Sequence, residues 1–227
     1  FGGLVWVGDQ LYAIDHPNQD VITLDLETNT ATYQFDASGY GDALSLTYDG
    51  TYLWIGYDGG LIGAYTLVGE AVGSFQSPPS SPPIMTPIPD TELFIVGNLG
   101  GNFETLDVVD VSGNIVSTIS LSSSDNSIFY DPLGGLFIID DYLWVVGFNG
   151  TLYEFTYNES TDLFILSNNA TIDLPNQNYN LSHDGNDLWT AAYAGTLLQI
   201  DDGHDSFNCF VVGPDAGCDG VCGSTLE

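Results

Sequence analysis

The chain contains neither lysine nor arginine. Its 227 residues carry 31 aspartates and glutamates and three histidines, so the formal net charge is −31 at pH 7. A surface without basic side chains offers phosphate groups no partner, which argues against nucleic acid and anionic membranes. The same absence excludes every Lys or Arg salt bridge and leaves trypsin-like proteases no bond to recognise.

Long apolar runs are missing as well. No stretch approaches the ~18 residues that cross a bilayer as a helix, so we predict no membrane insertion. The chain is nevertheless 44% hydrophobic and 13% aromatic, enough to bury a core in a domain of this size. Mutual repulsion of the acids requires screening by salt or by divalent cations. We therefore expect an extracellular, secreted or cell-surface location.

Calcium is the one cofactor that the composition suggests, because it favours carboxylate and carbonyl oxygens. The densest acidic cluster lies near the C-terminal end, and its members Asp201, Asp202 and Asp205 are weak metal candidates. They lack the full ligand spacing of an EF-hand loop. The alternative is a solvated acidic surface without a specific ion site and without any cofactor.

Recognised catalytic motifs are absent. His16, His183 and His204 lie far apart and form neither an H-x₃-H nor an H-E-x-x-H pair, which argues against zinc hydrolysis. The chain has no G-x-S-x-G nucleophile elbow and no glycine loop of the kind that cradles phosphate. These absences favour a protein that is not an enzyme.

A repeated strand pattern fills most of the chain. Short runs of Val, Ile, Tyr, Phe and Leu alternate with Gly, Asp and Asn, and five segments share an apolar strand, an acidic turn and a leucine followed by an aromatic residue. The anchor leucines, spaced by 42, 40, 50 and 45 residues, are Leu11, Leu53, Leu93, Leu143 and Leu188. Four strands in a unit of roughly 40–50 residues are typical of a β-propeller blade.

We therefore predict an all-β fold, a five-bladed β-propeller with four-stranded antiparallel blades, over residues 1–215. The predicted inner strands lie near 3–8, 43–48, 84–89, 134–139 and 178–183. The first unit begins with its inner strand, so closure would depend on packing of the first blade against the fifth. Two segments break the period: we expect 77–89 to be an extended crossing until its end, and 122–135 to be a surface insertion.

Two resemblances accompany this pattern. The segment DGTYLWIG at 49–56 and its counterparts resemble the blades of the NHL, YVTN and related propeller superfamily, which implies a fold more than a function. The last residues, GCDGVCGSTLE at 217–227, resemble C-x-G-V-C-G repeats of large secreted surface proteins. The second resemblance implies that 216–227 begins a cysteine-rich linker or stalk.

The three cysteines all lie in the last 19 residues, and they are Cys209, Cys218 and Cys222. Neither a nearby histidine nor a second cysteine pair completes a zinc site. We interpret them as disulfide-forming residues of an oxidising compartment. The odd number leaves one thiol to pair outside this set.

Four N-x-[ST] sequons are candidate glycosylation sites, and they begin at Asn149, Asn158, Asn169 and Asn180. The first two fall in predicted turns or loops and should be accessible. Asn180 falls on a predicted inner strand and is the least suited of the four.

An aromatic residue recurs at one position of every unit, as Tyr12, Trp54, Phe94, Trp144 and Trp189. We favour packing between blades over a sugar-binding ladder. The pairs Asp49-Gly50 and Asp184-Gly185 suit tight turns, and Asp9, Asp90 and Asp140 or Asp141 fall near the same turn elsewhere. Turn chemistry is the simpler interpretation, and a cation-gathering ring of carboxylates is the alternative.

The function that we expect is a non-catalytic extracellular structural or adhesion module, such as a subunit or head domain of a secreted appendage, filament or sheath. Its partners would be further copies or neighbouring domains of a longer chain, with glycans on one side. The alternative is a glycoside hydrolase that uses Asp42, Asp49 and Asp184 near the inner strands, or a lectin that uses exposed aromatic residues.

Overall fold

The computed structural model describes residues 1–78, 82–139, 141–171, 178–192 and 196–201. Nearly all of the regular structure is β-strand. The first sheet contains β1 (Leu4–Val7), β2 (Gln10–Asp15), β3 (Asp20–Asp25) and β4 (Thr30–Asp36). The second contains β5 (Ala43–Tyr48), β6 (Leu53–Tyr57), β7 (Leu61–Tyr65) and β8 (Ala71–Gln76). No described helix is long and apolar enough to span a bilayer.

Two further groups of four strands share one eight-stranded sheet. The first group is β9 (Pro83–Pro87), β10 (Leu93–Asn98), β11 (Thr105–Asp110) and β12 (Ile115–Ser122). The second is β13 (Leu133–Ile139), β14 (Tyr142–Gly147), β15 (Thr151–Asn158) and β16 (Leu163–Thr171). Each group is antiparallel, and the two are joined by a short parallel pairing of β12 with β16.

The last described sheet contains β17 (Asn178–His183), β18 (Leu188–Ala192) and β19 (Leu197–Ile200). The prediction of an all-β fold built from four-stranded antiparallel sheets is confirmed for the first two sheets and for both halves of the eight-stranded sheet.

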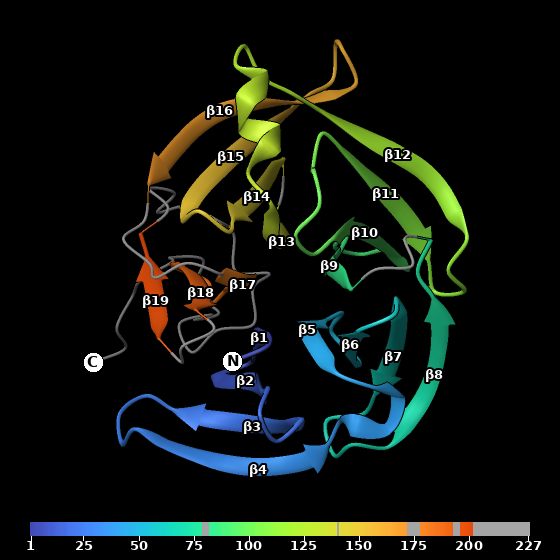
Figure 1. Cartoon of the computed structure of the whole chain (residues 1–227), viewed down its shortest axis with the longest axis vertical. Coiled ribbons are helices and arrows are strands. Elements are labelled where there is room, and N and C mark those ends of the chain that lie inside the picture. Colours follow the sequence, from blue (N-terminus) through green and yellow to red (C-terminus); the bar gives the residue numbers. More distant parts are fainter. Residues whose placement is uncertain (79–81, 140, 172–177, 193–195, 202–227) are drawn as a thin grey trace.

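The first strands of the five antiparallel groups lie side by side around one axis, and the later strands lie progressively farther out (Figure 1). We call β1, β5, β9, β13 and β17 the inner ring. Each of them contacts the next, and β17 contacts β1, so that the ring closes. Every predicted inner strand coincides with one of them to within two residues. The fold is therefore propeller-like.

The repeated aromatic residues are buried between neighbouring sheets. All five are at most 9% exposed. Trp54 of the second sheet packs edge-on against Phe94 of the third, with ring centroids 4.9 Å apart. Burial of such large side chains is a main source of stability, so the interpretation as packing residues is confirmed.

The first and last sheets meet without sharing a strand among the described residues. The backbone N–H of Trp6 donates to Ser182 Oγ at 3.0 Å, and Asn180 Nδ2 donates to the carbonyl of Leu4 at 3.2 Å. The Trp6 and Trp189 rings lie 5.5 Å apart in an edge-on arrangement. The first and last sheets thus close by packing, as predicted, and also by side-chain hydrogen bonds to the backbone, which were not predicted.

The segment 122–135 is more than a surface insertion. It carries the 3-10 helix η2 (Asn126–Tyr130), whose Phe129 is 3% exposed and packs edge-on against Phe103. Asp131 is also buried and accepts hydrogen bonds from Tyr153 Oη and from the backbone N–H of Asn149, both at 3.1 Å. These contacts attach the insertion to the core and correct the expectation that it only decorates the surface.

Candidate functional site

The two Asp-Gly pairs form turns that hold a tryptophan. Gly50 has a φ of +94°, a backbone conformation that only glycine adopts easily. Asp49 Oδ1 accepts from the backbone N–H groups of Thr51 and Tyr52, both at 2.7 Å. Its second oxygen, Oδ2, accepts from Trp54 Nε1 at 2.6 Å.

Asp184 repeats this arrangement in the last sheet. Its Oδ1 accepts from the backbone N–H groups of Asn186 and Asp187 at 2.9 Å, and its Oδ2 accepts from Trp189 Nε1 at 2.7 Å. Both carboxylates therefore close a turn, as the turn interpretation predicted, and each of them also orients an indole. The indole bond itself was not predicted, although the spacing of five residues between Asp and Trp in DGTYLW and DGNDLW was the available signal.

The three carboxylates predicted for an enzyme are not brought together. Asp42 precedes β5 and Asp49 follows it, so the two lie at opposite ends of one strand. Seven residues of extended chain separate their Cα atoms by roughly 20 Å, at about 3.3 Å per residue. Asp184 follows β17 and belongs to the same end as Asp49. Asp42 therefore has no catalytic partner in either of the other two.

The metal and disulfide predictions fall largely outside the described residues. Asp201 is exposed after β19, whereas Asp202 and Asp205 lie outside the described part of the chain. The same holds for all three predicted disulfide residues, Cys209, Cys218 and Cys222. Among the residues that the structure describes, no group of three or more His, Cys, Asp or Glu side chains could hold a metal ion.

The four sequons differ in access. Asn149 is exposed in the turn after β14, Asn169 is exposed on β16, and Asn158 is half-buried at the end of β15. Asn180 is only 1% exposed, and its Nδ2, the atom to which a glycan would be attached, donates to the carbonyls of Leu4 and Leu46. The folded chain thus leaves no room for a glycan on Asn180, and the other three positions stay candidates.

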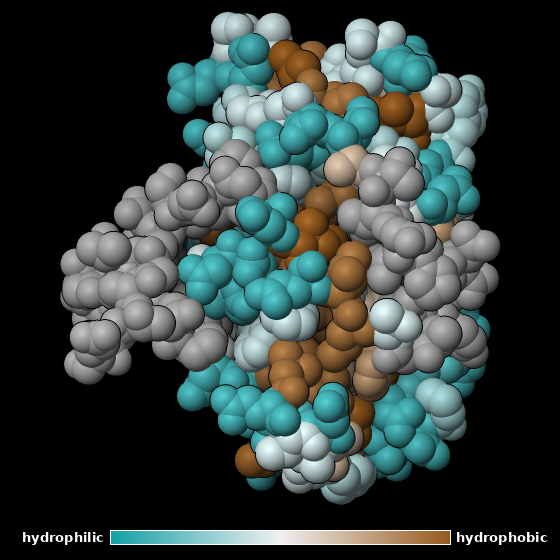
Figure 2. Space-filling view, turned by 90° about the vertical axis from the view of Figure 1, so that its left-hand side faces the viewer, coloured by the Kyte–Doolittle hydropathy of each residue, from teal (hydrophilic) through white to brown (hydrophobic). Residues whose placement is uncertain are grey.

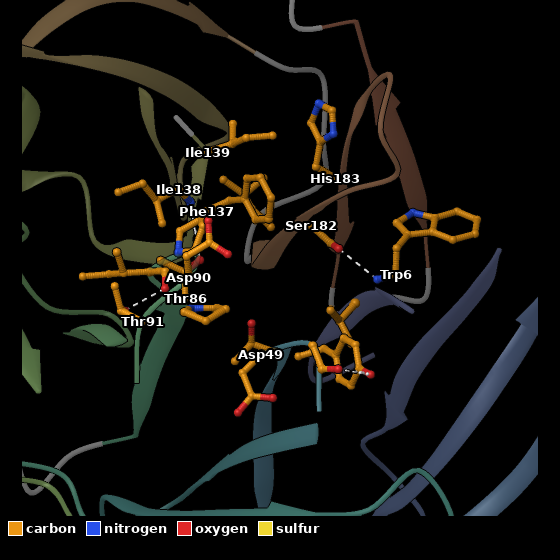
Figure 3. A pocket seen from close by; sticks show the side chains of 18 residues that line it. Trp6, Asp49, Thr86, Asp90, Thr91, Phe137, Ile138, Ile139, Ser182 and His183 are labelled. Atoms are coloured by element: carbon orange, nitrogen blue, oxygen red, sulfur yellow. Dashed lines mark hydrogen bonds between the residues drawn. The ribbon is translucent and has the colours of Figure 1, made fainter. Parts of the chain in front are cut away.

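A pocket of about 420 Å³ opens at one end of the inner ring, which we call the axial pocket (Figure 3). Every strand of the inner ring contributes to its wall. Three aromatic side chains line it, and they are Trp6, Tyr48 and Phe137. Two carboxylates, Asp49 and Asp90, belong to turns that follow β5 and β9 at its mouth.

His183 in the wall of the axial pocket is fixed by two contacts. Its ring stacks on Phe137 with centroids 5.8 Å apart and an interplanar angle of 11°. Its Nδ1 accepts from the backbone N–H of Gly185 at 3.0 Å, which assigns the proton of a neutral ring to Nε2. Burial, and secondarily the charge of Asp49, raises the pKa of Tyr48 above the ordinary value of a phenol.

The outermost strands form a second candidate surface. We call β4, β8, β12 and β16 the outer rim. Side chains in the first half of β4, β8 and β12 are exposed on both faces, among them Tyr33 at 60%, Val72 at 50% and Val116 at 57%. On the side of the molecule where β19 lies, apolar atoms form a band between polar margins (Figure 2).

Comparison with known proteins supports the fold. No family model and no curated protein matches the chain. A glutaminyl cyclase of Myxococcus xanthus aligns with a TM-score of 0.64 and 11% identity, over 88% of this chain and 90% of that one. A chain of a nidogen/laminin complex gives 0.56 and 11%, over 88% and 74%. A chain of a mitotic checkpoint complex gives 0.51 and 12%, over 89% and 66%.

These likenesses define the protein as an all-β protein with a propeller-like fold. Identities near 11% show the fold alone, and the similar chains include an enzyme and members of protein complexes.

Proposed function

We propose that the chain is a five-bladed β-propeller that serves as a non-catalytic extracellular assembly module and associates with further copies through its outer rim. The five antiparallel groups and the closed inner ring support the blade count. In this description β12 and β16 belong to neighbouring blades that touch at their outer edges.

The composition of the outer rim is the observation that carries this proposal. Its four strands comprise 30 residues and contain one acidic residue, Asp36, at the end of β4. At the chain's average of 31 acids in 227 residues, about four would be expected. Exposed strands normally discourage pairing between molecules with charged side chains or proline. The outer rim has no basic residue and no proline.

Two outer edges are open for pairing. Among the described strands β4 pairs only with β3, and β8 pairs only with β7. Their outer edges therefore present backbone N–H and C=O groups without ladder partners, which is a template for an added strand.

The molecule itself contains a precedent for such a contact. The outer strands β12 and β16 pair in parallel through Leu121 with Phe164 and Ser122 with Ile165. The same type of contact between β4 or β8 of two copies would extend a sheet from one molecule to the next. A glycan on the exposed Asn169 would restrict β16 and leave β4 and β8 as the available edges.

The enzyme and lectin alternatives have less support. A retaining or inverting glycosidase needs two carboxyl groups about 5–9.5 Å apart, one of them acting as a proton donor. Asp49 and Asp184 each accept three hydrogen bonds within their own turns, and Asp42 lies at the other end of β5. The repeated aromatic residues are buried, so they present no ladder to a sugar.

Charge placed on the open edges tests the proposal. In the double variant Thr32→Glu with Val72→Glu, two carboxylates stand on exposed positions of β4 and β8. We expect the unmodified chain to form oligomers or fibres in high salt or millimolar calcium, where repulsion is screened, and the variant to stay monomeric. Sedimentation velocity and negative-stain microscopy measure both outcomes.

The matched control is Val68→Glu, which adds a charge at a 75% exposed position in the turn between β7 and β8. We expect this variant to assemble like the unmodified chain. The proposal is wrong if the unmodified chain is monomeric at every salt concentration, or if the double variant assembles equally well.

A further inference from the structure

We infer that the axial pocket binds a small organic cation, an alkylammonium group carried on an apolar body. The inference is independent of assembly at the outer rim, because the axial pocket is lined by the inner ring and the turns that follow it. A cavity of about 420 Å³ accommodates a small ligand and is within the usual range for such sites.

The wall of the axial pocket is mainly apolar. Four of the five inner strands, or the turns after them, place aliphatic side chains there, and these include Val5, Pro87, Ile88, Ile138, Ile139 and Leu181. The fifth, β5, contributes Tyr48. The hydroxyls of Thr86 and Ser182 already accept backbone N–H groups, from Ile138 and Trp6. A sugar needs many polar partners, whereas apolar side chains make up more than half of this wall.

The charges of the chain favour a positively charged ligand over a negatively charged one. The chain has no lysine or arginine, so no such cation can compensate a bound phosphate or carboxylate. Asp90 is exposed at the mouth of the axial pocket, and the partly buried Asp49 lies there too, with its carboxylate accepting hydrogen bonds from its own turn and from Trp54. The net charge of −31 adds a field that attracts cations towards this opening.

Aromatic faces supply the contact that distinguishes an alkylammonium from a metal ion. Trp6, Tyr48 and Phe137 come from three different strands of the inner ring and are among the residues that line the axial pocket. In Figure 3 the Trp6 ring lies beyond Ser182, where it packs against Trp189, whereas Phe137 lies beside Ile138 with its ring stacked on His183. A desolvated ammonium group over an aromatic face is attracted by the quadrupole of the ring. A hydrated metal ion would instead need several oxygen ligands, and no such cluster occurs among the described residues.

A pair of ligands that differ only in charge measures the contribution of the positive charge to binding. Choline and its neutral carbon isostere 3,3-dimethyl-1-butanol have nearly the same shape, so titration calorimetry with both measures what the positive charge contributes. We expect choline to bind one-to-one and at least tenfold more tightly than the isostere. Glucose, acetate and phosphate should not bind.

Asp90→Asn tests the residue at the mouth. Asp90 has a φ of +59°, which asparagine tolerates as well as aspartate, so the turn should fold normally. We expect this variant to bind choline about tenfold more weakly. The control Asp42→Asn removes the same charge from an exposed position beyond the opposite end of β5, and its affinity should be unchanged.

Three results would overturn the inference. Equal affinity for the isostere would show an apolar pocket without cation selectivity. Equal weakening by Asp42→Asn would show that the overall field, and not the axial pocket, attracts the cation. Binding of glucose in place of choline would assign the pocket to neutral saccharides.

Discussion

The inner ring and the outer rim are both almost free of charge, but they differ in burial. The inner ring carries no Asp or Glu at all, and most of its side chains are buried. A carboxylate there would be costly, because the chain has no Lys or Arg to pair with it. The outer rim is exposed over the first halves of β4, β8 and β12 and has a single acid, Asp36. Burial explains the first absence but does not explain the second, which is the observation on which the proposed assembly through the outer rim depends.

The two regions also differ in how closely the backbone packs. A Cβ added at Gly135 of the inner ring would lie 2.5 Å from the backbone carbonyl carbon of Asn180. A Cβ added at Gly73 of the outer rim would meet nothing within 4 Å. The inner ring therefore has no space for a side chain at Gly135, whereas the outer rim has space for one at Gly73.

The largest expected effect is the loss of stability when a side chain is added at Gly135, where the backbones of β13 and β17 lie close together. Gly135→Ala should lower the free energy of unfolding by about 3 kcal/mol or more, because β13 and β17 must separate to admit a methyl group. Gly73→Ala should be neutral or slightly stabilising, since alanine restricts the unfolded chain. Urea denaturation followed by tryptophan fluorescence measures both.

This pair of substitutions also tests the comparison directly. If Gly135→Ala and Gly73→Ala have equal effects, the inner ring is not more tightly specified than the outer rim. If Gly73→Ala destabilises strongly, the outer rim is already packed against another molecule in solution.

A smaller loss of stability is expected from a substitution at Asp49, which lies in the turn between the inner strand β5 and the next strand, β6. The three groups that contact the Asp49 carboxylate are all N–H donors. In Asp49→Asn one carboxylate oxygen becomes an NH₂ group, which is itself a donor and would face one of these N–H groups without forming a hydrogen bond. Asp49→Asn should therefore cost roughly 1–3 kcal/mol of stability and change the fluorescence of Trp54. Asp58→Asn is the control, on an exposed residue at the end of β6, and should change little. An equal loss in both variants would show that the charge matters and the bonds do not.

The inner strands could be predicted from the sequence because the signal is local and repeated. The expected strand 43–48 is β5 without any shift, since its alternating apolar residues end at an Asp-Gly turn. The Asp–indole bond repeats at a fixed spacing, but it crosses a turn and depends on the path of the chain there. The role of Asp131 was equally hidden, because its partners Asn149 and Tyr153 are 18 and 22 residues away.

The axial pocket could not be predicted for a similar reason. Its wall combines residues as far apart in the sequence as Val5 and His183, and none of them stands in a recognisable motif. Only the order of the blades around the axis brings them together. Individual carboxylates such as Asp49 could be named in advance, but their neighbours could not.

Buried tyrosines should make the interior sensitive to alkali. Burial raises the pKa of Tyr153 to about 12, and the nearby charge of Asp131 adds to the shift. In the second sheet Tyr57 and Tyr65 share a 2.7 Å hydrogen bond between their hydroxyls, and burial raises the pKa of both.

The last expected effect is absent at neutral pH and appears only at high pH. The unfolded chain releases the Tyr153 proton near pH 10, whereas the folded chain keeps it until about pH 12, so stability should fall as pH rises through this window. Tyr153→Phe should reduce the slope of unfolding free energy against pH between 10 and 12. Tyr33→Phe, at a 60% exposed position of the outer rim, is the control. Equal slopes for the two variants in urea titrations would show that burial at Tyr153 does not couple ionisation to folding.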